Sequence, residues 1–190
     1  MWSNLVSNPR RGTFVLGLFI LTLGVGALAL PSLGRMDLRG VSIIDLELMR
    51  TSENAAEQIA RLGPTGVDAA QMSIYLDFPF LVLYALALSA ACAVLAARAA
   101  DRGATAVAAV GRLMVWVAPI AAALDAVENV ALLQVLNGHT DQPWPGIAYG
   151  IASVKFALLA LVIVYLIAGL VLVRRQHPLE TPVASPPVAS

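Results

Sequence analysis

Three polar side chains stand inside an otherwise apolar stretch, AAALDAVENVALLQVL, at residues 121–136. Asp125, Glu128 and Asn129 are spaced i, i+3 and i+4, so on a helix they share one face. Ionisable groups inside a membrane helix are costly and usually face a partner, water or a functional site. Two carboxylates in one site can act as acid and base when a neighbouring charge separates their pKa values. The charged and polar groups near these two carboxylates therefore decide which chemistry they can do.

Lys155 is the only lysine in the chain and is the natural counter-ion for these acids. At about 1.5 Å per helical residue, Lys155 lies about 28 Å from the arginines that end its own apolar run. The same count places Asp125 about 20 Å from Arg112, and Asp77 about 31 Å from Arg98. We therefore expect a charged layer in the outer third of the bilayer. The candidate ligand-binding residues are Ser73, Asp77, Tyr84, Asp125, Glu128, Asn129 and Lys155.

Other chemistries find little support in the composition. The two histidines lie far apart and Cys92 is the single cysteine, which excludes an intramolecular disulfide and argues against a metal or haem site. The 12 basic and 12 acidic residues leave no basic footprint for nucleic acid. The sequence shows no nucleophile–base pair and no phosphate-binding loop. We therefore expect no cofactor, no metal and no nucleic-acid partner, and we assign no catalytic residue.

The elements that position these residues are membrane helices. Hydrophobic residues make up 59% of the 190 positions and charged residues only 13%, and the mean hydropathy is +0.80. Soluble domains carry about 25% charged residues. Apolar runs of about 20 residues predict an all-α membrane protein, a four-transmembrane-helix bundle forming one domain over residues 1–176. We expect its helices at about 13–31, 69–97, 104–136 and 146–173. The first run is long for the apolar region of a signal peptide, so we expect it to be retained.

The distribution of arginine sets the expected orientation in the cell membrane. Placing both termini in the cytoplasm puts seven arginines inside and four outside, in agreement with the positive-inside rule. The outer loop is then residues 32–68, in which we expect a short amphipathic helix that begins at Ser52 and stops at Gly63. We expect VSIIDLEL to lie across the outer mouth of the bundle, Asp68 to cap the second membrane helix, and the tail at residues 177–190 to be disordered.

Two further features concern the membrane helices. Pro119 leaves the carbonyl of Val115 without its helical donor, which creates a backbone acceptor inside the bundle. On the last helix, small residues form one face that lies opposite Lys155 and could meet a second copy of the chain. These small residues are Gly146, Gly150, Ser153 and Ala157.

The succession IIDLEL, SIYLDFPFLVLY, LDAVENVALL and VKFALL, within residues 43–160, resembles a group of small bacterial four-helix integral membrane proteins of unassigned function. The resemblance implies that Asp77, Glu128, Asn129 and Lys155 belong together. It implies no activity.

Three functions remain open. Because three acids face one lysine, we expect a polar pocket that opens outward and takes a lipid-like or cationic small molecule. In a structural or assembly subunit, the charges would only staple the helices together. In a membrane-embedded enzyme, two carboxylates would act as acid and base on a lipid-like substrate. A closed cluster with every carboxylate paired would favour the structural alternative.

Overall fold

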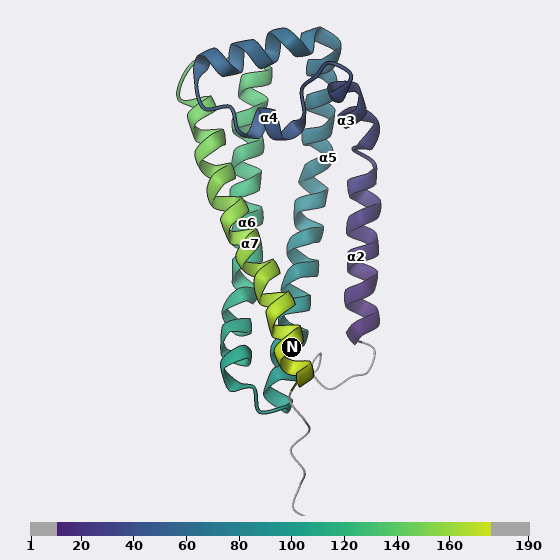
Figure 1. Cartoon of the computed structure of the whole chain (residues 1–190). Helices are drawn as coiled ribbons and strands as arrows, with labels where there is room; N and C mark the ends of the chain where they lie inside the picture. Colours follow the sequence, from purple (N-terminus) through teal and green to yellow (C-terminus); the bar gives the residue numbers. More distant parts are fainter. Residues whose placement is uncertain (1–10, 176–190) are drawn as a thin grey trace, which may run out of the picture.

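The computed structural model describes residues 11–175, and side chains from residue 12; the predicted disordered tail at 177–190 lies outside this range. Within it, every regular element is a helix (Figure 1). The helices are α2 (Arg11–Ala27), α3 (Leu30–Asp37), α4 (Ile43–Glu47), α5 (Ser52–Asp101), α6 (Thr105–Leu136) and α7 (Trp144–Arg175).

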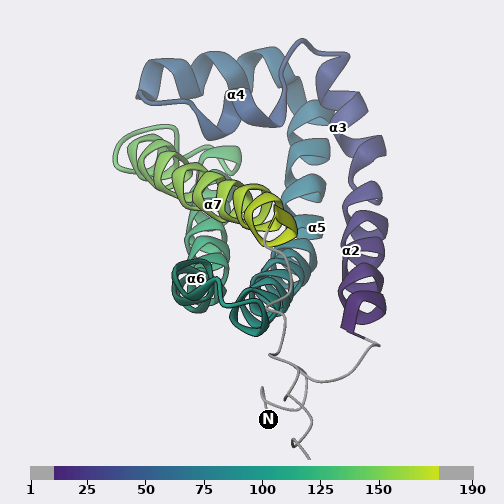
Figure 2. The ribbon, with the colours of Figure 1, turned by 60° about the horizontal axis from the view of Figure 1, so that its bottom comes forward.

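Three of these helices, α5, α6 and α7, are long and apolar enough to cross a membrane. The pair α2 and α3 is bent by 43° at a short break and counts as a fourth span if the pair is one segment. Residues 11–175 are thus all-helical and have the apolar helices of a membrane protein, as the sequence predicts. The three long helices pack on one another, whereas α2 lies mainly against α5, at the edge away from α6 (Figure 2).

The longest helix is divided at Gly63, whose φ of 60° is a left-handed conformation that favours glycine. Residues 52–62 form a short arm across the end of the bundle, and residues 64–101 form the long arm (Figure 1). The predicted start of a helix at Ser52 and its interruption at Gly63 are therefore confirmed, whereas its place in an outer loop stays a prediction. The predicted N-cap at Asp68 is wrong, because the long arm already begins beside Pro64, a residue suited to a first helical turn.

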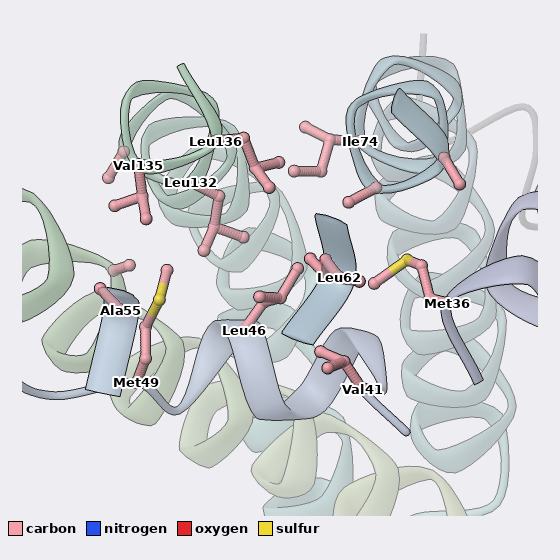
Figure 3. Packing of buried hydrophobic residues seen from close by; sticks show 14 residues of the cluster. Met36, Val41, Leu46, Met49, Ala55, Leu62, Ile74, Leu132, Val135 and Leu136 are labelled. Carbon is pink, nitrogen blue, oxygen red and sulfur yellow. The ribbon is translucent and has the colours of Figure 1, made fainter. Parts of the chain in front are cut away.

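The segment VSIIDLEL forms the helix α4 and part of the buried core at one end of the bundle. Ser42 and Asp45 make a reciprocal capping box, in which Asp45 N donates to Ser42 Oγ and Ser42 N donates to Asp45 Oδ2. Leu46 then points into a core shared with Leu62 and Leu132 (Figure 3). We call this end, made of α3, α4, residues 52–62 and the adjoining ends of α6 and α7, the cap end.

The opposite end of the bundle, the arginine end, is packed through small residues. Gly111 of α6 faces Ala96 of α5 and Tyr165 of α7. A Cβ at Gly111 would lie 2.6 Å from the Cβ of Ala96 and closer still to the Tyr165 hydroxyl. Three helices therefore meet at a point with no room for a side chain. Among residues 12–175, the arginines at this end are Arg98, Arg102, Arg112, Arg174 and Arg175.

Candidate functional site

Lys155 is the centre of a buried group of charges near the cap end. Its Nζ lies 2.8 Å from Glu128 Oε2, 3.0 Å from Asp125 Oδ1 and 3.5 Å from Glu47 Oε1. Lys155 is only 3% exposed, so its ammonium is held by protein carboxylates rather than by solvent. One cation is thus shared by three acids from α4 and α6.

The acids of α6 reach Lys155 because of their helical spacing. Asp125, Glu128 and Asn129 are all buried on the face that α6 turns toward α5 and α7. Ala118 and Ala121 continue that face and are fully buried, which lets the neighbouring helices approach closely. The i, i+3, i+4 pattern therefore places three polar groups in one contact region.

The long arm of α5 completes the group with two residues. Tyr84 donates its hydroxyl hydrogen to Asp125 Oδ2 at 2.9 Å. Asn129 Nδ2 donates to Asp77 Oδ2 at 2.7 Å, so each of these acids has a neutral partner. We call the assembled side chains the charged cluster. Its members are Glu47, Asp77, Tyr84, Asp125, Glu128, Asn129 and Lys155.

Six of the seven predicted site residues belong to this cluster, and Ser73 does not. The Ser73 hydroxyl donates to the carbonyl of Ala70, 2.8 Å away in its own helix, and needs no other partner. The convergence of the other six is an observation about geometry. That they bind a ligand stays a prediction.

Glu47 is the member that sequence reasoning missed. It comes from the five-residue helix α4, which lies against α5, α6 and α7. Burial raises the pKa of the Glu47 carboxyl, and the nearby Lys155 ammonium offsets this only in part. The capping box of α4, with serine followed three positions later by aspartate, is the sequence signal that marks this helix.

The pairing within the charged cluster is incomplete at Glu128. This side chain is fully buried, and within residues 11–175 its Oε1 has no hydrogen-bond donor. Oε2 lies 2.8 Å from Lys155 Nζ but outside hydrogen-bond orientation, so the contact is an ion pair without a formed hydrogen bond. Buried oxygens are rarely left without a donor, because the loss of hydration costs about 1–3 kcal/mol. Glu128 Oε1 is therefore the unsatisfied atom of the site.

The two cavities that the structure describes lie away from the charged cluster. A cavity of about 540 Å³ lies between α5 and α6, and another of about 360 Å³ lies between α6 and α7. Neither is lined by a member of the charged cluster, so the predicted polar pocket stays a prediction. Within residues 11–175, no three His, Cys, Asp or Glu side chains are grouped as metal ligands. The Lys155 ammonium lies among the acids where a metal would have to bind.

The small-residue face of α7 lies on the side away from the charged cluster. Gly150, Ser153 and Ala157 are exposed and Gly146 is half-buried, whereas Lys155 on the same helix is buried. This agrees with the predicted arrangement of the two faces. Association of two copies through the exposed face stays a prediction.

No family model, no curated protein and no solved structure matches this chain. What the protein does is therefore inferred from its own residues.

Proposed function

We propose that the chain is a four-span integral membrane protein with both ends in the cytoplasm. The spans would be α2 with α3, residues 64–101 of α5, α6 and α7. The five arginines of the arginine end support this orientation, because cytoplasmic ends of membrane helices are enriched in arginine and lysine. The cap end then faces outward, and the charged cluster lies beneath it.

Within this protein, we propose that the charged cluster binds a proton. Three carboxylates, from Glu47, Asp125 and Glu128, surround the single ammonium of Lys155. A fourth carboxylate of the cluster, Asp77, accepts a hydrogen bond from Asn129. Two like charges about 4 Å apart repel by about 4 kcal/mol even at an effective dielectric constant of 20. The surplus of negative charge therefore favours uptake of a positive charge. The observation that carries this proposal is the buried Glu128 Oε1, which a proton would turn from an unsatisfied acceptor into part of a neutral acid.

The proton is the cation that fits this geometry. Glu128 is 0% exposed and Asn129 beside it is 4% exposed, and neither described cavity touches them. A larger cation or a lipid amine would need space beside Lys155, which neither described cavity provides. Asp77 is half-buried, so it is the acid through which a proton would pass between the outer side and the interior of the cluster.

Proton binding would act on the cap end through Glu47. The groups that share this charge balance are Asp77 and Tyr84 of α5, Asp125 and Glu128 of α6, and Lys155 of α7. When the α6 acids are neutral, the Lys155 ammonium is freer to hold Glu47 and with it α4. When they are charged, they compete for the same ammonium. The protein would thus respond to protonation by changing how firmly α4 is bound.

The alternative, in which the charges only hold the helices together, is supported by a different observation, the burial of Lys155 between three acids. A fully ionised cluster would also fix the helices in register. The two functions differ in the charge of Glu128, which is neutral in a proton site and ionised in a staple. The enzyme alternative requires substrate access beside an acid, and neither described cavity supplies it.

Infrared spectroscopy of the purified protein tests the proposal, because a protonated carboxyl group gives a C=O stretch that a carboxylate lacks. At neutral pH we expect this band in the wild type and its loss in Glu128→Gln. Glu53→Gln is the matched control, since Glu53 is exposed and should leave the band unchanged. A wild-type spectrum without any protonated carboxyl band would contradict proton binding and favour a purely structural role for the charged cluster.

A further inference from the structure

A second site lies at the other end of the molecule, in the groove between α5 and α6. Its volume is about 540 Å³, within the roughly 300–1,000 Å³ range of small-molecule sites. It shares no residue with the charged cluster. It is lined from α5 by Leu86, Ser89, Ala93, Ala96, Ala97 and Ala100, and from α6 by side chains within residues 112–119. We call it the α5–α6 groove.

The body of the groove offers an apolar wall to an occupant. Four alanines of α5 form most of that side. Ser89 is the polar side chain of the α5 wall, and its hydroxyl donates to the carbonyl of Val115 at 2.9 Å. This is the carbonyl that Pro119 leaves without a helical donor, so both groups are satisfied. An occupant therefore gains apolar contact and no side-chain hydrogen bond along this wall.

The groove is long enough for a lipid chain. Leu86 and Ala100 are 14 helical residues apart, which corresponds to about 21 Å at 1.5 Å per residue. One leaflet of the hydrocarbon core of a bilayer is about 15 Å deep, half of roughly 30 Å. An acyl chain that starts at the arginine end would therefore stay in contact with the groove through its whole leaflet.

The groove is positively charged where Arg112 lines it. Arg112 is exposed, and no acidic side chain lines the groove within the described part of the chain. Among the described side chains, Arg112 forms no ion pair, so its guanidinium is available to an anion. Trp116 lies one turn further along the same face and is 68% exposed, in the manner of tryptophans at a membrane surface.

We propose that the α5–α6 groove binds one phospholipid with a net negative headgroup, with its phosphate on Arg112 and one acyl chain along the alanine wall. The proposal rests on the membrane placement given under the proposed function, and it is independent of proton binding at the charged cluster. Arginine suits this headgroup because its guanidinium donates two parallel hydrogen bonds to a phosphate.

Native mass spectrometry of the full chain in detergent, with added phosphatidylglycerol or phosphatidylcholine, tests this. We expect one retained phosphatidylglycerol that the zwitterionic lipid does not replace, and a rise in Tm on its addition. Arg112→Gln should weaken binding about tenfold or more, because it removes charge-assisted hydrogen bonds. Ala97→Leu should weaken binding independently, since it fills the groove without changing charge.

Arg174→Gln is the matched control, because Arg174 is an exposed arginine of the same end that does not line the groove. Retained binding in this variant supports the specific site. Equal weakening by Arg174→Gln and Arg112→Gln would show a diffuse attraction to the arginine end and overturn the proposal. Unchanged lipid binding in Ala97→Leu would show that no lipid chain lies in the groove. Conversion of a dimer to a monomer by Ala97→Leu would show that a second copy of the protein lies there. Either result would also overturn the proposal.

Discussion

Glu47 and Lys155 are separated by 108 positions in the chain, yet Glu47 Oε1 lies 3.5 Å from Lys155 Nζ. The first belongs to a five-residue helix of the cap end, and the second to the last long helix. The ion pair therefore ties the segment between α3 and α5 to the interior of the helix bundle. The cap end therefore contributes one residue, Glu47, to the charged cluster and is fixed to the bundle through it.

The first prediction concerns the pH dependence of stability through Glu47. Burial raises the pKa of Glu47 above its ordinary 4.5, so the folded state binds this proton more tightly than the unfolded state. The contribution of Glu47 to stability is then greatest below pH 4.5 and declines as the pH rises above it. The midpoint of thermal unfolding in detergent, measured from pH values below 4.5 to values above it, should show this decline in the wild type. The decline should be absent in Glu47→Gln.

Asp45→Asn is the control for Glu47→Gln, because Asp45 lies in the same helix and its pKa is shifted in the opposite direction. Hydrogen bonds from Ser42 lower the pKa of Asp45 below its ordinary 3.8. Its contribution is present above pH 3.8 and is lost as the pH falls through the folded pKa. The idea fails if both variants change the pH dependence in the same direction.

The second prediction concerns the ion pair between Lys155 and Asp125. Lys155→Met leaves buried acids without their cation and should destabilise the protein by about 3–5 kcal/mol. The double variant Lys155→Met with Asp125→Asn should be the more stable of the two, because it leaves one fewer orphan charge. Tyr84 can still donate to the amide oxygen. Denaturant titration followed by circular dichroism measures both, and a double variant less stable than Lys155→Met would contradict this account.

The third prediction concerns membrane orientation. In a Cys92→Ala background, a cysteine at position 57 should react with an impermeant maleimide added to intact cells, because residue 57 lies on the arm at the cap end. A cysteine at position 101, in the last turn of α5, should react only after the cells are opened. The reverse pattern of labelling would invert the proposed topology.

The fourth prediction concerns the contact of three helices at Gly111. Gly111→Ala adds a Cβ that has no room against Ala96 and Tyr165, so we expect a loss of about 1–3 kcal/mol from overpacking. Gly24→Ala is the matched control, since a Cβ there meets nothing within 4 Å. The control should be neutral or more stable by about 0.5–1 kcal/mol. Equal effects in the two variants would show that the helices do not pack as described.

The sequence predicts the parts of this structure that follow from local periodicity or from a unique residue. The apolar runs locate the long helices, the i, i+3, i+4 spacing places three α6 side chains on one face, and the single lysine identifies the counter-ion. Glu47 and Ser73 are different cases. Glu47 joins the cluster because of where a five-residue helix lies over the bundle, which is a tertiary contact. Ser73 lies on the predicted face, but its hydroxyl bonds to its own helix.

The distance in sequence between Glu47 and Lys155 has a consequence for biosynthesis. Glu47, Asp77, Asp125 and Glu128 are all translated before Lys155, so a nascent chain that lacks α7 carries the four acids of the charged cluster and no lysine. Until α7 inserts, these acids have to remain hydrated or protonated, and α4 has no cation to hold it. Insertion of α7 would therefore supply the cation of the charged cluster and the ion-pair partner of Glu47 in one event, so the cap end would be fixed to the bundle only when α7 is in place.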